Sequence, residues 1–177
     1  MMLVGDHGRF AIEYELDRLP GGSAGLGPGL GHWMFGRIRW WCGGEKIGRY
    51  QPNTAIRAVA AAAERILLCD SARRSPALMA LPAPEVAHIV TAALFADDDR
   101  SDEQIAADGA RYWPFFVGPR TESFEPWDIF VVEDDLAARL IWGQAGLPEV
   151  RERGLRRGEF AGVLRDFLGT LEWGDRQ

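Results

Sequence analysis

The sequence predicts an α+β fold in which a mainly antiparallel sheet, built from an N-terminal meander and a second hairpin, is covered by helices. Three observations support this class. Residues 10–17 and 33–42 alternate apolar and polar side chains, the middle of the chain repeats apolar residues at helical spacing, and a second strand pair precedes a final amphipathic stretch. This order differs from the regular strand–helix alternation of a doubly wound parallel sheet.

The N-terminal meander has the clearest pattern. In Phe10–Asp17 apolar side chains alternate with acids, so one face is expected to be buried and the acids to point outward. Trp33–Cys42 also has period two: one side carries Trp33, Phe35, Arg37, Arg39 and Trp41, and the other Met34, Gly36, Ile38, Trp40 and Cys42. The sequence CysGlyGlyGlu then allows a tight reversal into a strand over Lys46–Tyr50. The side chains expected to face the helices are Ile12, Tyr14, Ile38 and Trp40.

Residues 1–177 are expected to form a single globular domain with a flexible Gly/Pro-rich hairpin loop at 19–31. The first helix is predicted to open at Asn53 or Thr54, whose side chain would cap it. A second helix begins near Pro84, and a short one is possible at Asp102–Ala107. Apolar spacing over Phe160–Leu171 predicts the last helix.

The second half of the chain contains the remaining strands. The segment Tyr112–Val117 is predicted to be a strand or a buried extended segment, limited by Pro114. Trp127–Glu133 and Ala137–Gly143 predict a hairpin, to which Val150–Arg156 adds a strand.

Composition limits the classes of function. With 47% hydrophobic residues and seven tryptophans among 177 residues, the chain is globular rather than disordered. A net charge of −6 argues against nonspecific binding to nucleic acid or to an anionic membrane. Residues 85–135 hold thirteen acidic and three basic residues, a balance of −10. The start lacks the pattern of a signal peptide, so we expect a cytoplasmic protein.

The residues that carry chemistry form no recognisable motif. The three histidines are separated by tens of residues, and Cys42 and Cys69 are both expected on apolar faces as inert thiols. We therefore predict no catalytic, cofactor-binding or metal site. The acids of the second strand, Glu13 among them, are expected mainly to form ion pairs with Arg37 and Arg39 across the sheet.

Several segments carry a resemblance to a known family. They are FAIEYELD, the aromatic strand leading through Gly43–Gly44 to IGRY, the helix opening at Asn53–Thr54, and WDIFVVEDDLAARLIWG followed by RRGEF and a C-terminal helix. In these segments the chain resembles the immunity protein 42 family of bacterial polymorphic-toxin systems, whereas residues 71–125 match poorly. The resemblance implies inhibition of a cognate protein toxin by binding, and it supplies no residue-level inhibitory site.

Two other classes of function stay open: a small enzyme whose carboxylates, such as Glu13, Glu15 or Asp128, assemble only in three dimensions, and a ligand-binding module. Most tryptophans are expected in the core, and an exposed tryptophan beside acids would indicate a binding surface. For toxin binding the candidates are acids expected in solvated loops and one tryptophan. They are Asp97, Asp98, Asp99, Asp102, Glu103, Trp127, Glu133, Asp134 and Asp135.

Overall fold

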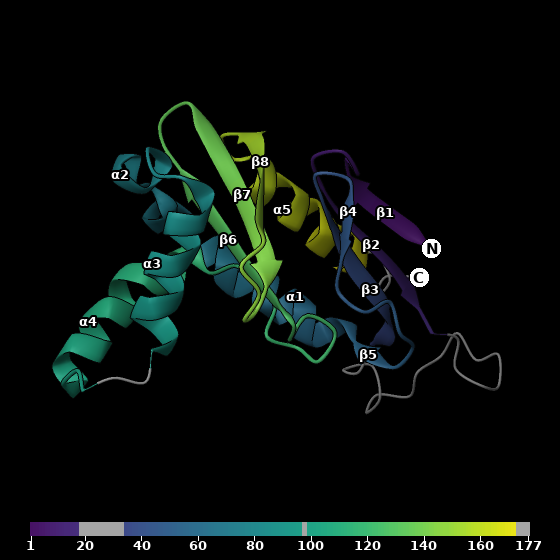
Figure 1. The fold of residues 1–177 in the computed structure, drawn as a ribbon. Helices are drawn as coiled ribbons and strands as arrows, with labels where there is room; N and C mark the ends of the chain where they lie inside the picture. Colours follow the sequence, from purple (N-terminus) through teal and green to yellow (C-terminus); the bar gives the residue numbers. More distant parts are fainter. Residues whose placement is uncertain (18–33, 97–98, 173–177) are drawn as a thin grey trace.

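The fold contains two antiparallel sheets in the computed structural model, which describes residues 1–17, 34–96 and 99–172 (Figure 1). Among the described residues the first sheet has the order β1-β2-β3-β4, with β5 paired to β3, and the second has the order β6-β7-β8. The strands are β1 (Met2–Gly5), β2 (Phe10–Leu16), β3 (Phe35–Cys42), β4 (Glu45–Ile47), β5 (Thr54–Ala55), β6 (Trp127–Glu133), β7 (Ala137–Gln144) and β8 (Val150–Arg156). The predicted α+β class is confirmed, with the second hairpin forming a sheet of its own.

Helices cover both sheets. α1 and α5 pack on each other and on the first sheet, and α3 lies on the opposite side of the second sheet together with α4 (Figure 1). The helical segments are α1 (Ile56–Leu68), η1 (Asp70–Arg73), α2 (Pro76–Met79), α3 (Ala83–Phe95), α4 (Asp102–Tyr112), η2 (Trp113–Phe115) and α5 (Glu159–Glu172).

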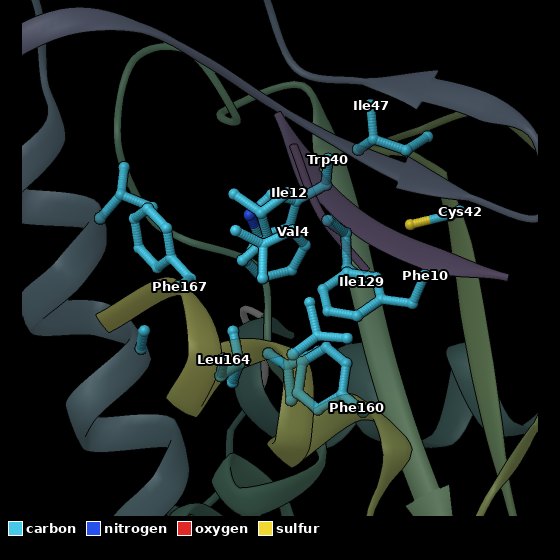
Figure 2. Close-up of a cluster of buried hydrophobic side chains, with 14 of the residues drawn as sticks. Val4, Phe10, Ile12, Trp40, Cys42, Ile47, Ile129, Phe160, Leu164 and Phe167 are labelled. Atoms are coloured by element: carbon cyan, nitrogen blue, oxygen red, sulfur yellow. The ribbon is translucent and has the colours of Figure 1, made fainter. Parts of the chain in front are cut away.

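The first sheet packs the predicted apolar face against the helices. Phe10, Ile12 and Tyr14 lie opposite Cys42, Trp40 and Ile38 in the register of β2 and β3. Trp40 is 0% exposed, and its ring lies 5.2 Å from Phe10, 5.4 Å from Phe124 and 6.1 Å from Phe160 between ring centroids. Figure 2 shows Trp40, Phe10 and Phe160 in one cluster. The predicted inward face of the meander is therefore confirmed.

The outer face of the first sheet differs from the expectation at one acid. Glu13 points away from the helices, as predicted, yet it is only 3% exposed. Arg39 and Trp41 on β3 cover its carboxylate and donate hydrogen bonds of 2.8 Å to it. The carboxylate can be charged in this buried position because Arg39 and Trp41 on the next strand donate hydrogen bonds to it.

Strand β6 of the second sheet is buried on both faces from Ile129 onward, which explains its nearly continuous apolar run. Ile129 and Val131 join the core beneath the first sheet. Phe130 and Val132 join a second core with α3. The second sheet therefore separates the first sheet and α5 on one side from α3 and α4 on the other (Figure 1).

Two boundaries in the first half were predicted wrongly. α1 begins at Ile56 without a side-chain cap, because Thr54 and Ala55 pair with β3 as β5. β4 ends at Ile47 because Gly48 takes a φ of +97°, which strand residues do not adopt. The segment 19–31 and Trp33 lie outside the described residues, so the loop there stays a prediction.

The middle of the chain is more helical than predicted. The helix expected at Asp102–Ala107 extends to Tyr112, with Ser101 and Gln104 forming a capping box at its start. Trp113–Phe115 continues it as a 3₁₀ turn, so the extended segment expected at Tyr112–Val117 is restricted to its last residues. Val117 donates a backbone hydrogen bond of 2.8 Å to Ile129, which attaches the end of this segment to β6.

The two cysteines differ from each other. Cys42 is buried in the first sheet, as expected. Cys69 is exposed because it follows the last residue of α1 and does not lie on the packed face of that helix. The prediction of two buried thiols is therefore wrong for Cys69.

Candidate functional site

Three aromatic rings meet where α3 ends and α4 passes into η2. The ring centroids of Phe95, Trp113 and Phe116 lie 5.5 to 5.9 Å apart, and each pair meets edge to face. Phe95 is 39% exposed and Trp113 is 45% exposed. Large aromatic side chains in contact with each other and with solvent are typical of interaction surfaces.

Arg120 lies over this cluster. Its guanidinium carbon is 4.9 Å from the ring centroid of Phe95 and 5.9 Å from those of Trp113 and Phe116, within the range of cation–π contact. The side chain is exposed, and it forms no ion pair with any described residue. We call Phe95, Trp113, Phe116 and Arg120 the aromatic ridge.

The ridge is held by the second sheet and by α4. Phe116 forms an isolated bridge with Phe130 of β6, and the two ring centroids lie 5.6 Å apart. Beneath Trp113, a Cβ atom at Gly109 would lie 3.4 Å from the indole ring, so the absence of a side chain allows close packing. The ridge therefore belongs to a packed scaffold, which lowers the entropy that binding would cost.

A hollow of about 720 Å³ lies on one side of the ridge. Phe95, Phe116 and Arg120 form part of its wall, and Trp127 of β6 forms another part. Its carboxylates are Glu122, Glu125 and Asp128. We call it the acidic hollow. Its volume is in the range of roughly 300–1,000 Å³ that ligand and side-chain pockets occupy.

Asp128 is the most enclosed of these carboxylates. Burial raises its pKa, and the positive charge of Arg120 opposes that rise in part. The residue lies near the start of β6 opposite Gly143, and it also lines an adjoining hollow of about 260 Å³ with His88. A cation entering the acidic hollow would compensate for the lost hydration of Asp128.

A second hollow, of about 250 Å³, lies on the other side of the ridge. Trp113, Phe116 and Arg120 line it together with Arg65 of α1 and Cys69. Among the described residues that form this hollow there is no carboxylate. We call it the basic hollow.

Comparison with known proteins identifies the family. The model of the family described as immunity protein 42 matches residues 2–170, nearly the whole chain. The chain belongs to the immunity protein 42 family. This immunity protein therefore neutralises a bacterial toxin, as the resemblance in the sequence implies.

A solved structure has the same fold. The crystal structure of CdiI from Burkholderia dolosa AUO158 aligns with a TM-score of 0.70 and 23% sequence identity, over 96% of this chain and 99% of that chain. At this identity the likeness establishes the fold of the immunity protein. No curated protein matches the sequence. Within the described residues, no helix combines the length and the apolar character needed to cross a membrane.

The predicted toxin-binding residues of the immunity protein lie in different places. Trp127 is half-buried and lines the acidic hollow. Asp99, Asp102 and Glu103 are exposed around the start of α4. Asp97 and Asp98 lie outside the described residues, so nothing places them relative to the ridge.

The other three predicted residues lie at the far end of β6. Seven residues of strand span about 20 Å, so Glu133 is that far from Trp127. Glu133 is 4% exposed rather than solvated, and burial raises its pKa. The expectation of a solvated Glu133 is wrong because the segment after η1 pairs with this end of β6: Arg74 forms an isolated bridge with Glu133, and Ser75 donates a backbone hydrogen bond of 2.9 Å to it.

Asp134 and Asp135 have structural partners in the β6–β7 turn. The carboxylate of Asp134 accepts hydrogen bonds of 2.7 and 2.8 Å from the backbone N–H groups of Leu136 and Ala137, which lower its pKa. Asp135 forms an ion pair with Arg74. Their part in toxin binding stays a prediction.

Sequence reasoning did not identify the aromatic ridge. Among the tryptophans in residues 34–96 and 99–172, Trp142 is buried as expected and Trp113 is the exposed one. Its exposure could not be read from the sequence, because Trp113 lies in a segment that was expected to be extended and buried. Phe95 contacts Trp113 through the packing of α3 against η2, and Arg120 comes from the segment between η2 and β6.

Proposed function

We propose that this immunity protein neutralises its cognate toxin by stoichiometric binding, with the aromatic ridge and the acidic hollow as the contact surface. The observation that carries the proposal is the exposed ring cluster with an arginine stacked on it that forms no ion pair within 4.0 Å with a described residue. Tryptophan and arginine side chains supply much of the binding energy at protein interfaces. A rigid ridge of these residues is suited to be the anchor of a toxin complex.

Charge supports the same surface. The carboxylates Glu122, Glu125 and Asp128 face the acidic hollow, and Asp102 and Glu103 are exposed in the first turn of α4. They belong to the segment 85–135, whose charge balance is −10. Such a surface attracts a basic partner and raises the association rate at low salt.

The proposal includes Asp99, Asp102, Glu103 and Trp127 from the residues predicted by sequence. Asp134 is held by its own turn, and Asp135 already has an arginine partner. Those two carboxylates would lose existing bonds on binding a toxin, whereas Glu122 and Glu125 have no ion pair with any described residue. Unpaired charges beside exposed rings gain most from a partner.

Binding rather than chemistry is the mechanism we propose. Glu122 and Glu125 are exposed and Asp128 is half-buried, so the carboxylates of the hollow can bind basic side chains of a partner. The partner is a protein toxin, and the proposal involves neither nucleic acid nor membrane. A complex that covers the toxin surface is sufficient for neutralisation.

Co-expression with the cognate toxin tests the proposal. The variant carries Phe95→Ala and Trp113→Ala, which remove the exposed rings, and Arg120→Ala is a second variant that leaves the rings in place. Leu136→Ala is the matched control, because Leu136 is 87% exposed and lies in the β6–β7 turn. We expect growth rescue by wild type and by the control, and loss of rescue by the ring variant at equal soluble expression. Full rescue by both ridge variants would contradict the proposal.

A further inference from the structure

The two hollows beside the aromatic ridge have opposite charge. Phe116 and Arg120 line both hollows, so the hollows lie on the two sides of these side chains. Arg65 and Arg120 give the basic hollow two positive charges, with no carboxylate among the described residues that line it. On the other side, three carboxylates face the single guanidinium of Arg120.

Three of these charged side chains have no ion-pair partner in the described part of the chain. Arg65, Glu122 and Glu125 are exposed, and the described part of the chain offers none of them an ion-pair partner within 4.0 Å. Some arginines elsewhere are paired within the molecule, such as Arg39 with Glu13 and Arg139 with Glu152, whereas others, such as Arg57 and Arg153, are exposed without an ion pair to a described residue. What distinguishes Arg65, Glu122 and Glu125 is their position in the hollows on the two sides of an exposed ring cluster, where a docked partner would meet them.

We infer that the toxin surface that docks on the ridge is bipolar, placing a carboxylate over Arg65 and Arg120 and a basic side chain in the acidic hollow. The inference rests on the proposed function and names the chemistry of the toxin epitope. An apolar part of the same epitope would cover the exposed rings of Phe95, which lines the acidic hollow, and Trp113, which lines the basic hollow.

Side-chain chemistry favours this arrangement on each side. Two guanidinium groups present planar sets of donors that match the geometry of a carboxylate. In the acidic hollow an arginine of the toxin would meet carboxylates together with the rings of Phe116 and Trp127, on which a guanidinium can stack. The bound toxin would shield the ion pairs in both hollows from water. The lower local dielectric constant would make these charge interactions stronger than on the free surface.

A bipolar epitope also explains selectivity. A surface that is only acidic attracts every basic toxin, because long-range attraction depends on net charge. Two regions of opposite sign on either side of the ridge add an orientation, since a toxin docked the wrong way round would bring like charges together. The immunity protein would then distinguish its cognate toxin from others of the same net charge.

The test compares charge reversals inside and outside the hollows, using the purified full-length immunity protein and its cognate toxin. Arg65→Glu reverses the basic hollow, and Glu125→Arg reverses the acidic one. Arg57→Glu and Glu64→Arg are the controls. Both residues are exposed on α1, and these substitutions change the net charge by the same amounts as the hollow variants. Dissociation constants and association rates are measured at about 0.05 and 0.3 M salt.

We expect Arg65→Glu and Glu125→Arg each to weaken binding by at least about tenfold at both salt concentrations, mainly through faster dissociation, whereas the controls change it by no more than about threefold. The milder variants Arg65→Gln and Glu125→Gln should also weaken binding, and by less than the charge reversals. Because they disturb the structure less, weaker binding by them would not result from misfolding. A tenfold effect on only one side, or hollow variants that behave like their controls, would overturn the bipolar epitope.

The ridge variant distinguishes this inference from the proposed function. If Phe95→Ala with Trp113→Ala abolishes binding while the charge variants match their controls, the ridge binds the toxin and only the bipolar epitope is wrong. If the ridge variant binds like wild type, the proposed surface itself is wrong.

Discussion

Arg39 donates two hydrogen bonds to the carboxylate of Glu13 on the neighbouring strand, both 2.8 Å long. The Glu13 side chain is 4% exposed and that of Arg39 is 19% exposed, so the pair is largely removed from water. The guanidinium also lies over the ring of Tyr50, 4.4 Å from its centroid. Because Glu13 is buried, its carboxylate depends on these donors to remain charged.

Arg39→Ala should therefore lower the free energy of unfolding by about 3 kcal/mol, because it leaves a buried carboxylate without its main partner. Arg37→Ala is the matched control, since Arg37 lies opposite the half-buried Glu15 on the same two strands, and it should cost less than about 1 kcal/mol. Urea denaturation of both variants provides the measurement. Equal losses of unfolding free energy in the two variants would show that the Arg39–Glu13 ion pair contributes no more to stability than Arg37 does.

The same pair predicts a pH dependence of stability. The hydrogen bonds from Arg39, followed by the one from Trp41, lower the pKa of Glu13 in the folded protein below its ordinary value. A lowered folded-state pKa stabilises the fold above the unfolded-state value, about 4.3 for glutamate, and this contribution is lost as the pH falls through the folded-state pKa. The difference in unfolding free energy between wild type and Glu13→Gln should thus be largest near pH 7 and shrink towards pH 2. A difference that does not change over this range would contradict the assignment.

Gly48 and Gly44 allow a steric prediction with an internal control. Both have positive φ, +97° and +91°. A Cβ at Gly48 would lie 2.9 Å from the ring of Phe124, whereas at Gly44 nothing lies within 4 Å. Both alanine variants pay the backbone cost of about 1 kcal/mol, and Gly48→Ala should cost about 1–3 kcal/mol more because Phe124 is packed in the core. Thermal unfolding that ranks Gly44→Ala as the less stable variant would contradict this.

The two thiols should react at very different rates. Burial raises the pKa of Cys42 well above its ordinary value, while Cys69 is exposed at the end of α1. An aromatic disulfide reagent should modify one thiol per folded chain rapidly and the second only after denaturation. Cys69→Ser should abolish the rapid reaction and Cys42→Ser should leave it intact. Two rapid thiols in the folded wild type would show that the first sheet opens readily.

Local sequence patterns predicted the strands and helices better than they predicted the functional site. The alternation in Phe10–Leu16 and Phe35–Cys42 specified both the strands and their buried faces, because one register places all the apolar side chains together. The burial of Glu13 was not predictable in the same way, since it depends on donors from the next strand. Glu133 was correctly expected at the end of a strand, but its acidic neighbours suggested a solvated side chain. Its burial goes with the pairing of Arg74 and Ser75 with this end of β6, which no local pattern indicates.

The aromatic ridge shows the limit of the sequence most clearly. Phe95 is the last residue of α3, and Trp113 is the first residue of η2. Considered alone, each aromatic residue would be expected in the core. Their 5.6 Å contact, and the position of Arg120 above them, result from packing between segments that no short pattern connects. The acidity of residues 85–135 did point to this half of the chain, but charge alone could not separate Glu122 and Glu125 from Asp134 and Asp135.

Amide hydrogen exchange of the immunity protein, free and in a saturated complex with its cognate toxin, tests the central claim most directly. The ridge as the contact surface predicts added protection in residues 113–128 and at the end of α3, with unchanged exchange in the β6–β7 turn at residues 134–137. Protection of that turn or of the outer face of the first sheet, with residues 113–128 unchanged, would contradict it.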